Sequence, residues 1–87
     1  MKPNNDVQMY VVYHNGPKGD ERAFFFKGKT WNSKCTTNFD QAFKTDSMDT
    51  ACVVAIGINA AAKEAEHPLA GQIKVGQLTV KPVFTAM

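Results

Sequence analysis

The sequence predicts a small α+β domain in which one main helix packs on one face of an antiparallel sheet of three or four strands. Three observations carry this prediction. Apolar and polar residues alternate near the N-terminus, an alanine-rich stretch follows a helix-capping signal, and strand-forming residues return after Pro68. The expected order is strand, strand, a short third strand, helix, strand. The 87 residues are expected to form a single domain, because two separate cores need about 50 residues each.

A hairpin is predicted at the start of the domain. Residues 7–14 alternate with a period of two, which is typical of a strand with one buried face. Residues 15–20 contain Asn, Gly, Pro and Asp and therefore favour a loop. The aromatic stretch 22–27 is expected to return antiparallel to the first strand. Residues 1–6 show no such pattern and are expected to be a flexible N-terminus.

The main helix is predicted over residues 47–65. Asp46 or Ser47 can cap its first turn, Asp49 suits the positive end of the helix dipole, and Pro68 ends it. Gly57 opposes the helix by roughly 1 kcal/mol relative to alanine. The short apolar run 51–58 also fits a buried strand followed by a shorter helix, and periodicity alone does not separate these two interpretations.

The segments on either side of the helix have weaker patterns. Residues 28–45 have room for a short third strand but also contain turn-forming residues, and Phe39, Ala42 and Phe43 are spaced for one helical turn. A last strand is predicted over residues 72–84, where the apolar positions change parity at Gly76. A bulge at Gly76 explains this change, and a hairpin turning there is the alternative. Pro82 cannot donate a hydrogen bond, so this end is expected at a sheet edge.

A helical wheel separates two apolar stripes on the predicted helix. The first is expected to face the sheet and consists of Ala51, Val54, Ile58, Ala61, Ala62 and Ala65. The second lies nearly opposite and consists of Val53, Ile56 and Ala60. A single sheet covers only one helix face. The second stripe is therefore either covered by the loop 31–43 or forms a protein interface.

Composition and motifs argue against an enzyme, a membrane protein or a metalloprotein. Cys35 and Cys52 lack the C-x-x-C spacing of redox and zinc sites, and neither pairs with His14 or His67 at ligand spacing. No run is apolar enough for a signal peptide or a membrane span, so a cytoplasmic location is expected. No glycine motif predicts a nucleotide cofactor. Capping explains the carboxylates around residues 40–49, so we expect no catalytic residues and no cofactor.

Charge is distributed unevenly around a net +2: residues 1–39 carry +3, residues 40–66 carry −3 and residues 67–87 carry +2. The stretch 22–39 has no acidic residue and interleaves cations with aromatic rings. Single-stranded nucleic acid is bound by such combinations, through base stacking and phosphate contacts. The residues that would bind it are Arg22, Phe24, Phe26, Lys27, Lys29, Trp31 and Lys34. The competing interpretation is a hydrophobic strand whose lysines discourage edge pairing.

In its size, its strand–strand–helix–strand order and the segment 39–45 that leads into the helix, the chain resembles small α+β proteins encoded by bacteriophages. The resemblance covers roughly residues 7–84. Several of those proteins bind and inhibit host or defence proteins, so it implies stoichiometric binding to a protein partner. The basic charge departs from the acidic inhibitors that imitate DNA. We therefore expect a non-enzymatic protein-binding module, with a homodimer left open and single-stranded nucleic-acid binding as the alternative function.

Overall fold

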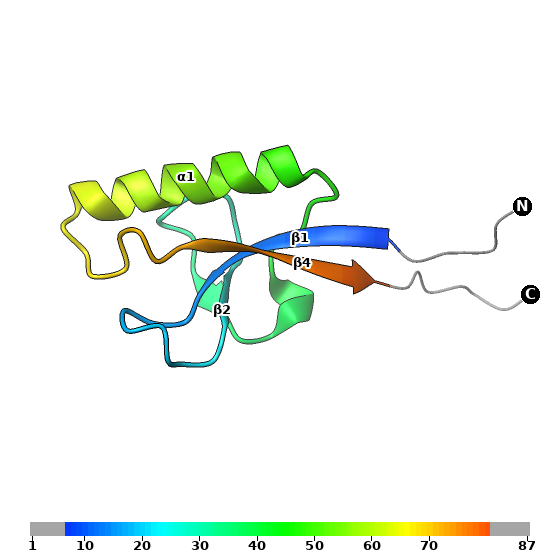
Figure 1. Ribbon diagram of the computed structural model, residues 1–87, viewed down its shortest axis with the longest axis horizontal. Helices are drawn as coiled ribbons and strands as arrows, with labels where there is room; N and C mark the ends of the chain where they lie inside the picture. The colour runs from blue at the N-terminus through cyan, green and yellow to red at the C-terminus, as the bar shows by residue number, and fades with distance from the viewer. Residues whose placement is uncertain (1–6, 81–87) are drawn as a thin grey trace, which may run out of the picture.

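One helix lies over a four-stranded antiparallel sheet in the computed structural model, which describes residues 7–80 (Figure 1). The elements in chain order are β1 (Val7–His14), β2 (Phe24–Phe26), β3 (Cys35–Thr36), the 3-10 turn η1 (Phe39–Gln41), α1 (Met48–Glu64) and β4 (Lys74–Val80). The strand order in the sheet is β3-β2-β1-β4. This arrangement confirms the predicted α+β class and element order. Residues 1–6 and Pro82 lie outside the described residues.

Helix α1 begins and ends with hydrogen bonds that explain its length. The Ser47 hydroxyl accepts from the Thr50 N–H at 3.1 Å, which caps the first turn. At the other end, Glu66 adopts a positive φ of 54° and its N–H donates to the Lys63 carbonyl, while the His67 N–H donates to the Ala62 carbonyl. This pair of bonds is a Schellman motif. The segment 51–58 is therefore helical, and its interpretation as a buried strand is wrong.

The buried face of α1 differs slightly from the predicted stripe. It consists of Ala51, Val54, Ala55, Ile58 and Ala62. Ala55 joins this face, whereas Ala61 is only half-buried and Ala65 is exposed. Ala65 was expected in the stripe, but it is the residue at which the helix ends and the chain turns toward β4.

Strands β1 and β4 pair without interruption, from Val7 opposite Val80 to Tyr13 opposite Lys74. Gly76 lies directly opposite Val11 with no extra residue, so both the bulge and the hairpin predicted at this glycine are wrong. A Cβ on Gly76 would lie 3.0 Å from Cε1 of the Tyr13 ring. The parity of the apolar residues changes because Val75, opposite Val12, faces the core, whereas Leu78, opposite Met9, lies on the other face of the sheet, where the Tyr13 ring covers Gly76.

Two segments pair with the side of β1 that faces away from β4: strand β2 and the residues that follow η1. β2 pairs with the end of β1, with Tyr13 opposite Phe25. Beyond β2, Thr45 exchanges two backbone hydrogen bonds with Tyr10, of 2.8 and 3.1 Å, and the Phe43 N–H donates to the Phe26 carbonyl at 3.0 Å. The segment after η1 therefore continues the sheet alongside β1. This bridge positions the cap of α1 over the strands.

The core lies between α1 and one face of the sheet. Its buried members are Val12, Phe26, Val54, Ala55, Ile58, Leu69 and Ile73, and Trp31, Phe43 and Val75 pack against them. Because side chains alternate along a strand, Tyr13 and Phe25 point to the other face of the sheet. Among residues 7–80, no helix is both long enough and apolar enough to cross a membrane.

Candidate binding surfaces

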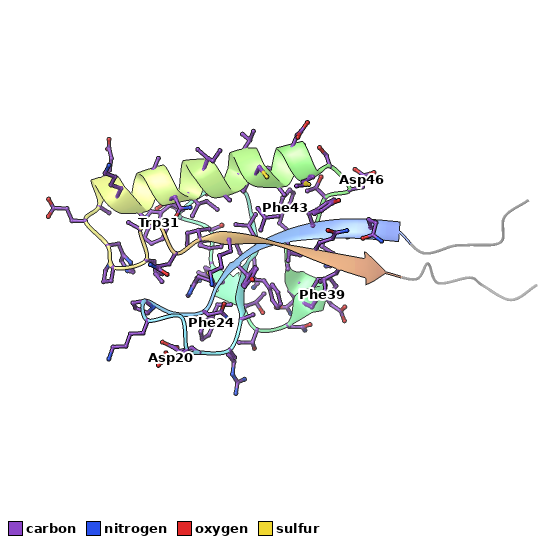
Figure 2. The ribbon with its side chains drawn as sticks, viewed as in Figure 1. Asp20, Phe24, Trp31, Phe39, Phe43 and Asp46 are labelled. Carbon is purple, nitrogen blue, oxygen red and sulfur yellow. The ribbon has the colours of Figure 1, made fainter. Side chains whose placement is uncertain are left out.

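The second apolar stripe of α1 is exposed. We call it the outer stripe, and it consists of Val53, Ile56 and Ala60. Val53 and Ile56 each expose 68% of their surface, and Ala60 is also exposed. The loop 31–43 does not cover them, because Trp31 and Phe43 pack beneath the helix against the core instead (Figure 2). Of the two interpretations of this stripe, cover by the loop is therefore wrong.

Charged residues bound the outer stripe at both ends. Asp49 is exposed one turn before Val53, and Lys63 and Glu64 are exposed one turn after Ala60. A shallow hollow of about 370 Å³ lies beside the first end, between Lys29 and the side chains at the start of α1. Nothing lies within 4 Å of the position that a Cβ would take on Gly57, so the helix backbone is open there. An apolar centre with a polar rim is typical of protein interfaces.

The aromatic side chains predicted to stack on nucleic-acid bases are not gathered on one surface. Phe26 is only 2% exposed and belongs to the core, so it has no face available for a base. Phe24 is half-buried, and its ring stacks on the His14 ring with centroids 5.2 Å apart. Trp31 packs on the core and meets the His67 ring edge-on at 4.9 Å. Including Phe26 among the predicted nucleic-acid-binding residues was therefore wrong. Side chains alternate along β2, and this alternation points Phe26 toward α1.

The cations of the same segment remain accessible but separate. Arg22, Lys27 and Lys34 are exposed, while Lys29 lies with its Nζ atom 5.5 Å from the centre of the Phe43 ring, beside the hollow at the start of α1. Lys29 therefore lies near the helix and not beside the open face of β2. The seven candidate residues do not form one binding surface.

A different set of aromatic residues lies on the face of the sheet turned away from α1. Tyr13 and Phe25 are half-buried cross-strand partners with ring centroids 6.3 Å apart. Phe39 from η1 meets Phe25 edge-on at 5.7 Å. A groove of about 450 Å³ opens beside them and is lined by Val11, Tyr13, Ala23, Phe25, Val75, Gly76, Gln77 and Leu78. The sequence analysis did not predict this surface. The available signal was the two-residue alternation along β1 and β2, which puts Tyr13 and Phe25 on the opposite face from Val12 and Phe26.

His14 and Cys35, which are far apart in the sequence, lie beside each other in the structure. The His14 Nε2 atom lies 3.8 Å from the Cys35 sulfur. The Gly16 N–H donates to His14 Nδ1 at 3.0 Å, so in the neutral ring Nε2 carries the proton and donates toward sulfur. Burial lowers the pKa of His14 and raises the pKa of the Cys35 thiol. The pair is therefore a neutral thiol beside a neutral imidazole, the opposite of what activates a nucleophilic cysteine.

Metal binding has no candidate among the described residues. Within residues 7–80, no group of three or more His, Cys, Asp or Glu side chains is close enough to hold an ion. His67 uses Nδ1 to accept from the Leu69 N–H at 3.1 Å, which is a local contact in the turn after α1.

The environment of His14 predicts that stability depends on pH. Burial lowers the pKa of His14 below its ordinary 6.5, an effect that nearby Glu21 partly opposes and His67 adds to. The unfolded chain then binds more protons than the folded chain just below pH 6.5. We expect the free energy of unfolding to fall as the pH is lowered below about 6.5, measured by urea denaturation at several pH values.

The variant His14→Asn tests whether this pH dependence comes from His14. His14→Asn keeps a side-chain acceptor for the Gly16 N–H and removes the titrating ring. It is expected to flatten the pH profile below about 6.5. An unchanged slope in the variant would assign the dependence to other groups.

The sequence matches no protein-family model, and neither a curated protein nor a solved structure was found with significant similarity to it. What places the chain in a class is its fold, a small α+β domain. Its function is therefore argued from its own surfaces.

Proposed function

We propose that this protein is a non-enzymatic protein-binding module that contacts its partner through the outer stripe of α1. The observation that carries the proposal is the 68% exposure of both Val53 and Ile56. They lie three residues apart, and Ala60 follows four residues later, so the three form one continuous apolar line on the helix. Single exposed apolar residues are common, but a continuous line bounded by charges is typical of a contact surface.

The spacing of the outer stripe indicates how the partner would bind. Val53, Ile56 and Ala60 occupy positions i, i+3 and i+7, which are the anchor positions of a helix that lies in an apolar groove of another protein. Burying a valine or isoleucine side chain contributes about 1.5–3 kcal/mol, so two such anchors are enough for a specific contact. Gly57 lets the groove wall approach the helix backbone closely.

The resemblance to small phage proteins supports a more specific version of this proposal. In that version the chain acts in the cytoplasm as a stoichiometric inhibitor that occupies the groove of a host or defence protein. Nothing but binding is required of it, in keeping with the unactivated state of the His14 and Cys35 pair. A second copy of the chain is the other occupant that the same stripe accommodates, which would make the protein a homodimer.

The test replaces the two anchors together. Val53→Asn with Ile56→Asn is expected to weaken partner binding about 30-fold or more, because anchor residues of interfaces contribute at least 2 kcal/mol. The fold should survive, since exposed substitutions change stability by roughly 0.5 kcal/mol. Partners are captured from a lysate of the cell in which the protein acts, with and without nuclease, and the affinity of a purified partner is measured by titration calorimetry.

Two controls keep this experiment decisive. Leu78→Asn removes a comparable apolar side chain, 38% exposed, from the sheet and should leave the proteins captured in the presence of nuclease unchanged. Sedimentation equilibrium of the parent chain and the double variant detects a homodimer that depends on Val53 and Ile56. If the double variant captures the same proteins with the same affinity, the outer stripe is not the contact surface and the proposal is wrong.

A further inference from the structure

The face of the sheet turned away from α1 carries a second surface, which does not depend on the proposed function of the outer stripe. We infer that this face binds single-stranded nucleic acid. The bases stack in the groove beside Tyr13 and Phe25, and the phosphates contact Lys27, Lys34 and Lys74.

The strand register brings the aromatic rings together. Tyr13 on β1 is directly opposite Phe25 on β2, so both side chains leave the sheet on the same face. Their ring centroids are 6.3 Å apart at an interplanar angle of 51°. Both are half-buried, so part of each ring remains open to the groove. Aromatic rings on the open face of a sheet are the platform on which single-stranded RNA and DNA stack two or three bases.

The groove itself has the shape and chemistry for a flat ring. Its volume of about 450 Å³ falls in the range of small-molecule sites. The Tyr13 ring lies over Gly76, which has no side chain of its own, and Val11 and Leu78 complete the apolar walls. None of the eight residues that line it is charged. A base can therefore be buried there without leaving a charged group desolvated.

Exposed lysines lie on both sides of the groove. Lys74 is the β4 partner of Tyr13 and shares its face. Lys27 follows Phe25 by two residues and therefore has the same parity, and its N–H donates to the Lys34 carbonyl at 2.8 Å. The β2–β3 ladder thus continues to these two lysines. From β4 to β3 the sheet spans roughly 14 Å, at about 4.8 Å per strand spacing.

This layout favours a polyanion with flat rings over other ligands. An apolar centre alone would fit a protein segment, but cations at both ends of an uncharged groove match the phosphates that precede and follow a short run of stacked bases. The core-facing aromatics Phe24 and Phe26 take no part. The site is built from the residues that alternate with them, including Phe25 and Lys27.

The experiment measures binding of a labelled ~12-nucleotide oligo(dT) and oligo(rU) to the intact protein by fluorescence anisotropy. Binding is expected at about 50 mM salt and should weaken at about 200 mM, with a slope of log affinity against log salt near −2 for three lysine contacts. A preference for oligo(rU) would indicate contacts to the 2′-hydroxyl, and a preference for oligo(dT) would indicate DNA; either supports the site.

Matched variants locate the binding on this face. Lys27→Gln with Lys74→Gln should reduce the salt slope and weaken binding about tenfold, whereas Lys18→Gln with Lys63→Gln removes the same charge elsewhere and should change little. Phe25→Leu keeps an apolar side chain but removes the ring, and should weaken binding about fivefold or more. Circular dichroism confirms that each variant is folded.

The outcomes also separate this site from the outer stripe. The variant with Val53→Asn and Ile56→Asn should bind the oligonucleotide as tightly as the parent chain, whatever happens to its protein partner. The inference is overturned if no salt-sensitive binding occurs at about 50 mM salt. It is also overturned if the two lysine pairs lose affinity equally, because that would show attraction by net charge alone.

Discussion

Phe26→Ala is expected to lower the free energy of unfolding by about 3–5 kcal/mol, the range for removing a buried aromatic side chain from a core. Phe26 is 2% exposed and packs with Val12, Val54 and Ile58 between the sheet and α1. Its ring also meets the His14 ring edge-on at 5.9 Å. Domains of this size are stabilised by only about 5–15 kcal/mol, so the variant should be partly unfolded or close to unfolding at 37 °C.

The neighbouring Phe25→Ala supplies the control for this prediction. Phe25 differs by one position and lies half-buried on the opposite face, against Tyr13 and Phe39. Its removal opens no closed cavity, so we expect a loss clearly smaller than that of Phe26→Ala, measured by urea denaturation followed by circular dichroism. Equal losses for the two variants would show that both faces of β2 are equally packed, which would contradict the assignment of Phe25 to an open surface.

The two proposed binding surfaces lie on opposite sides of the core to which Phe26 belongs. Helix α1 covers one face of the sheet (Figure 1). The outer stripe lies on the side of α1 away from the core, and the aromatic groove lies on the opposite face of the sheet. A partner bound to one face leaves the other accessible. The two proposals are therefore compatible in one molecule and can be tested with separate variants.

Local patterns predicted the elements that depend on local interactions. The alternation over residues 7–14 matches β1, and the capping residue and alanine content matched α1 to within about one residue at each end. The wheel left open whether the loop 31–43 covers Val53 and Ile56, but it placed them away from the core stripe, because their angular distance from that stripe is a property of the helix alone. These features need no knowledge of what the segment packs against.

Features that depend on pairing between distant segments were not predicted. The parity change at Gly76 suggested a bulge, but the Tyr13 ring from β1 covers the glycine while the register continues. In the same way, alternation placed Phe24 and Phe26 on one face without showing that this face meets α1. The pairing of Tyr13 with Phe25 decides that question, and no local signal specifies it.

Asn59 is the second residue whose replacement should have a large effect. Its Nδ2 donates to the Ile73 carbonyl at 3.1 Å, and its Oδ1 accepts from the Gly71 N–H at 2.9 Å and the Ile73 N–H at 3.2 Å. One side chain on α1 therefore satisfies three backbone groups of the segment that leads into β4. No buried side-chain nitrogen or oxygen lacks a hydrogen-bond partner within residues 7–80, so this network is complete as it stands.

Asn59→Ala is expected to lower the free energy of unfolding by about 3 kcal/mol, because partly buried backbone groups lose their partners at about 1–3 kcal/mol each. Alanine is favoured over asparagine in a helix by up to about 0.7 kcal/mol, so this gain in helix propensity partly offsets the loss of the hydrogen bonds. Hydrogen exchange of the Gly71 and Ile73 amides gives a direct readout. Both should exchange faster in the variant, even where the rest of β4 stays protected.

The control is Asn32→Ala, an exposed asparagine in the loop between β2 and β3, which should change stability by no more than about 0.5 kcal/mol. If Asn59→Ala behaves like this control, or if Gly71 and Ile73 remain protected, the side chain does not hold the segment.

Loss of the hydrogen bonds of Asn59 has a consequence beyond stability. Ile73 precedes β4, and the register that follows places Gly76 beneath the Tyr13 ring. Asn59→Ala should therefore also weaken oligonucleotide binding on the opposite face of the sheet, although Asn59 itself lies on α1.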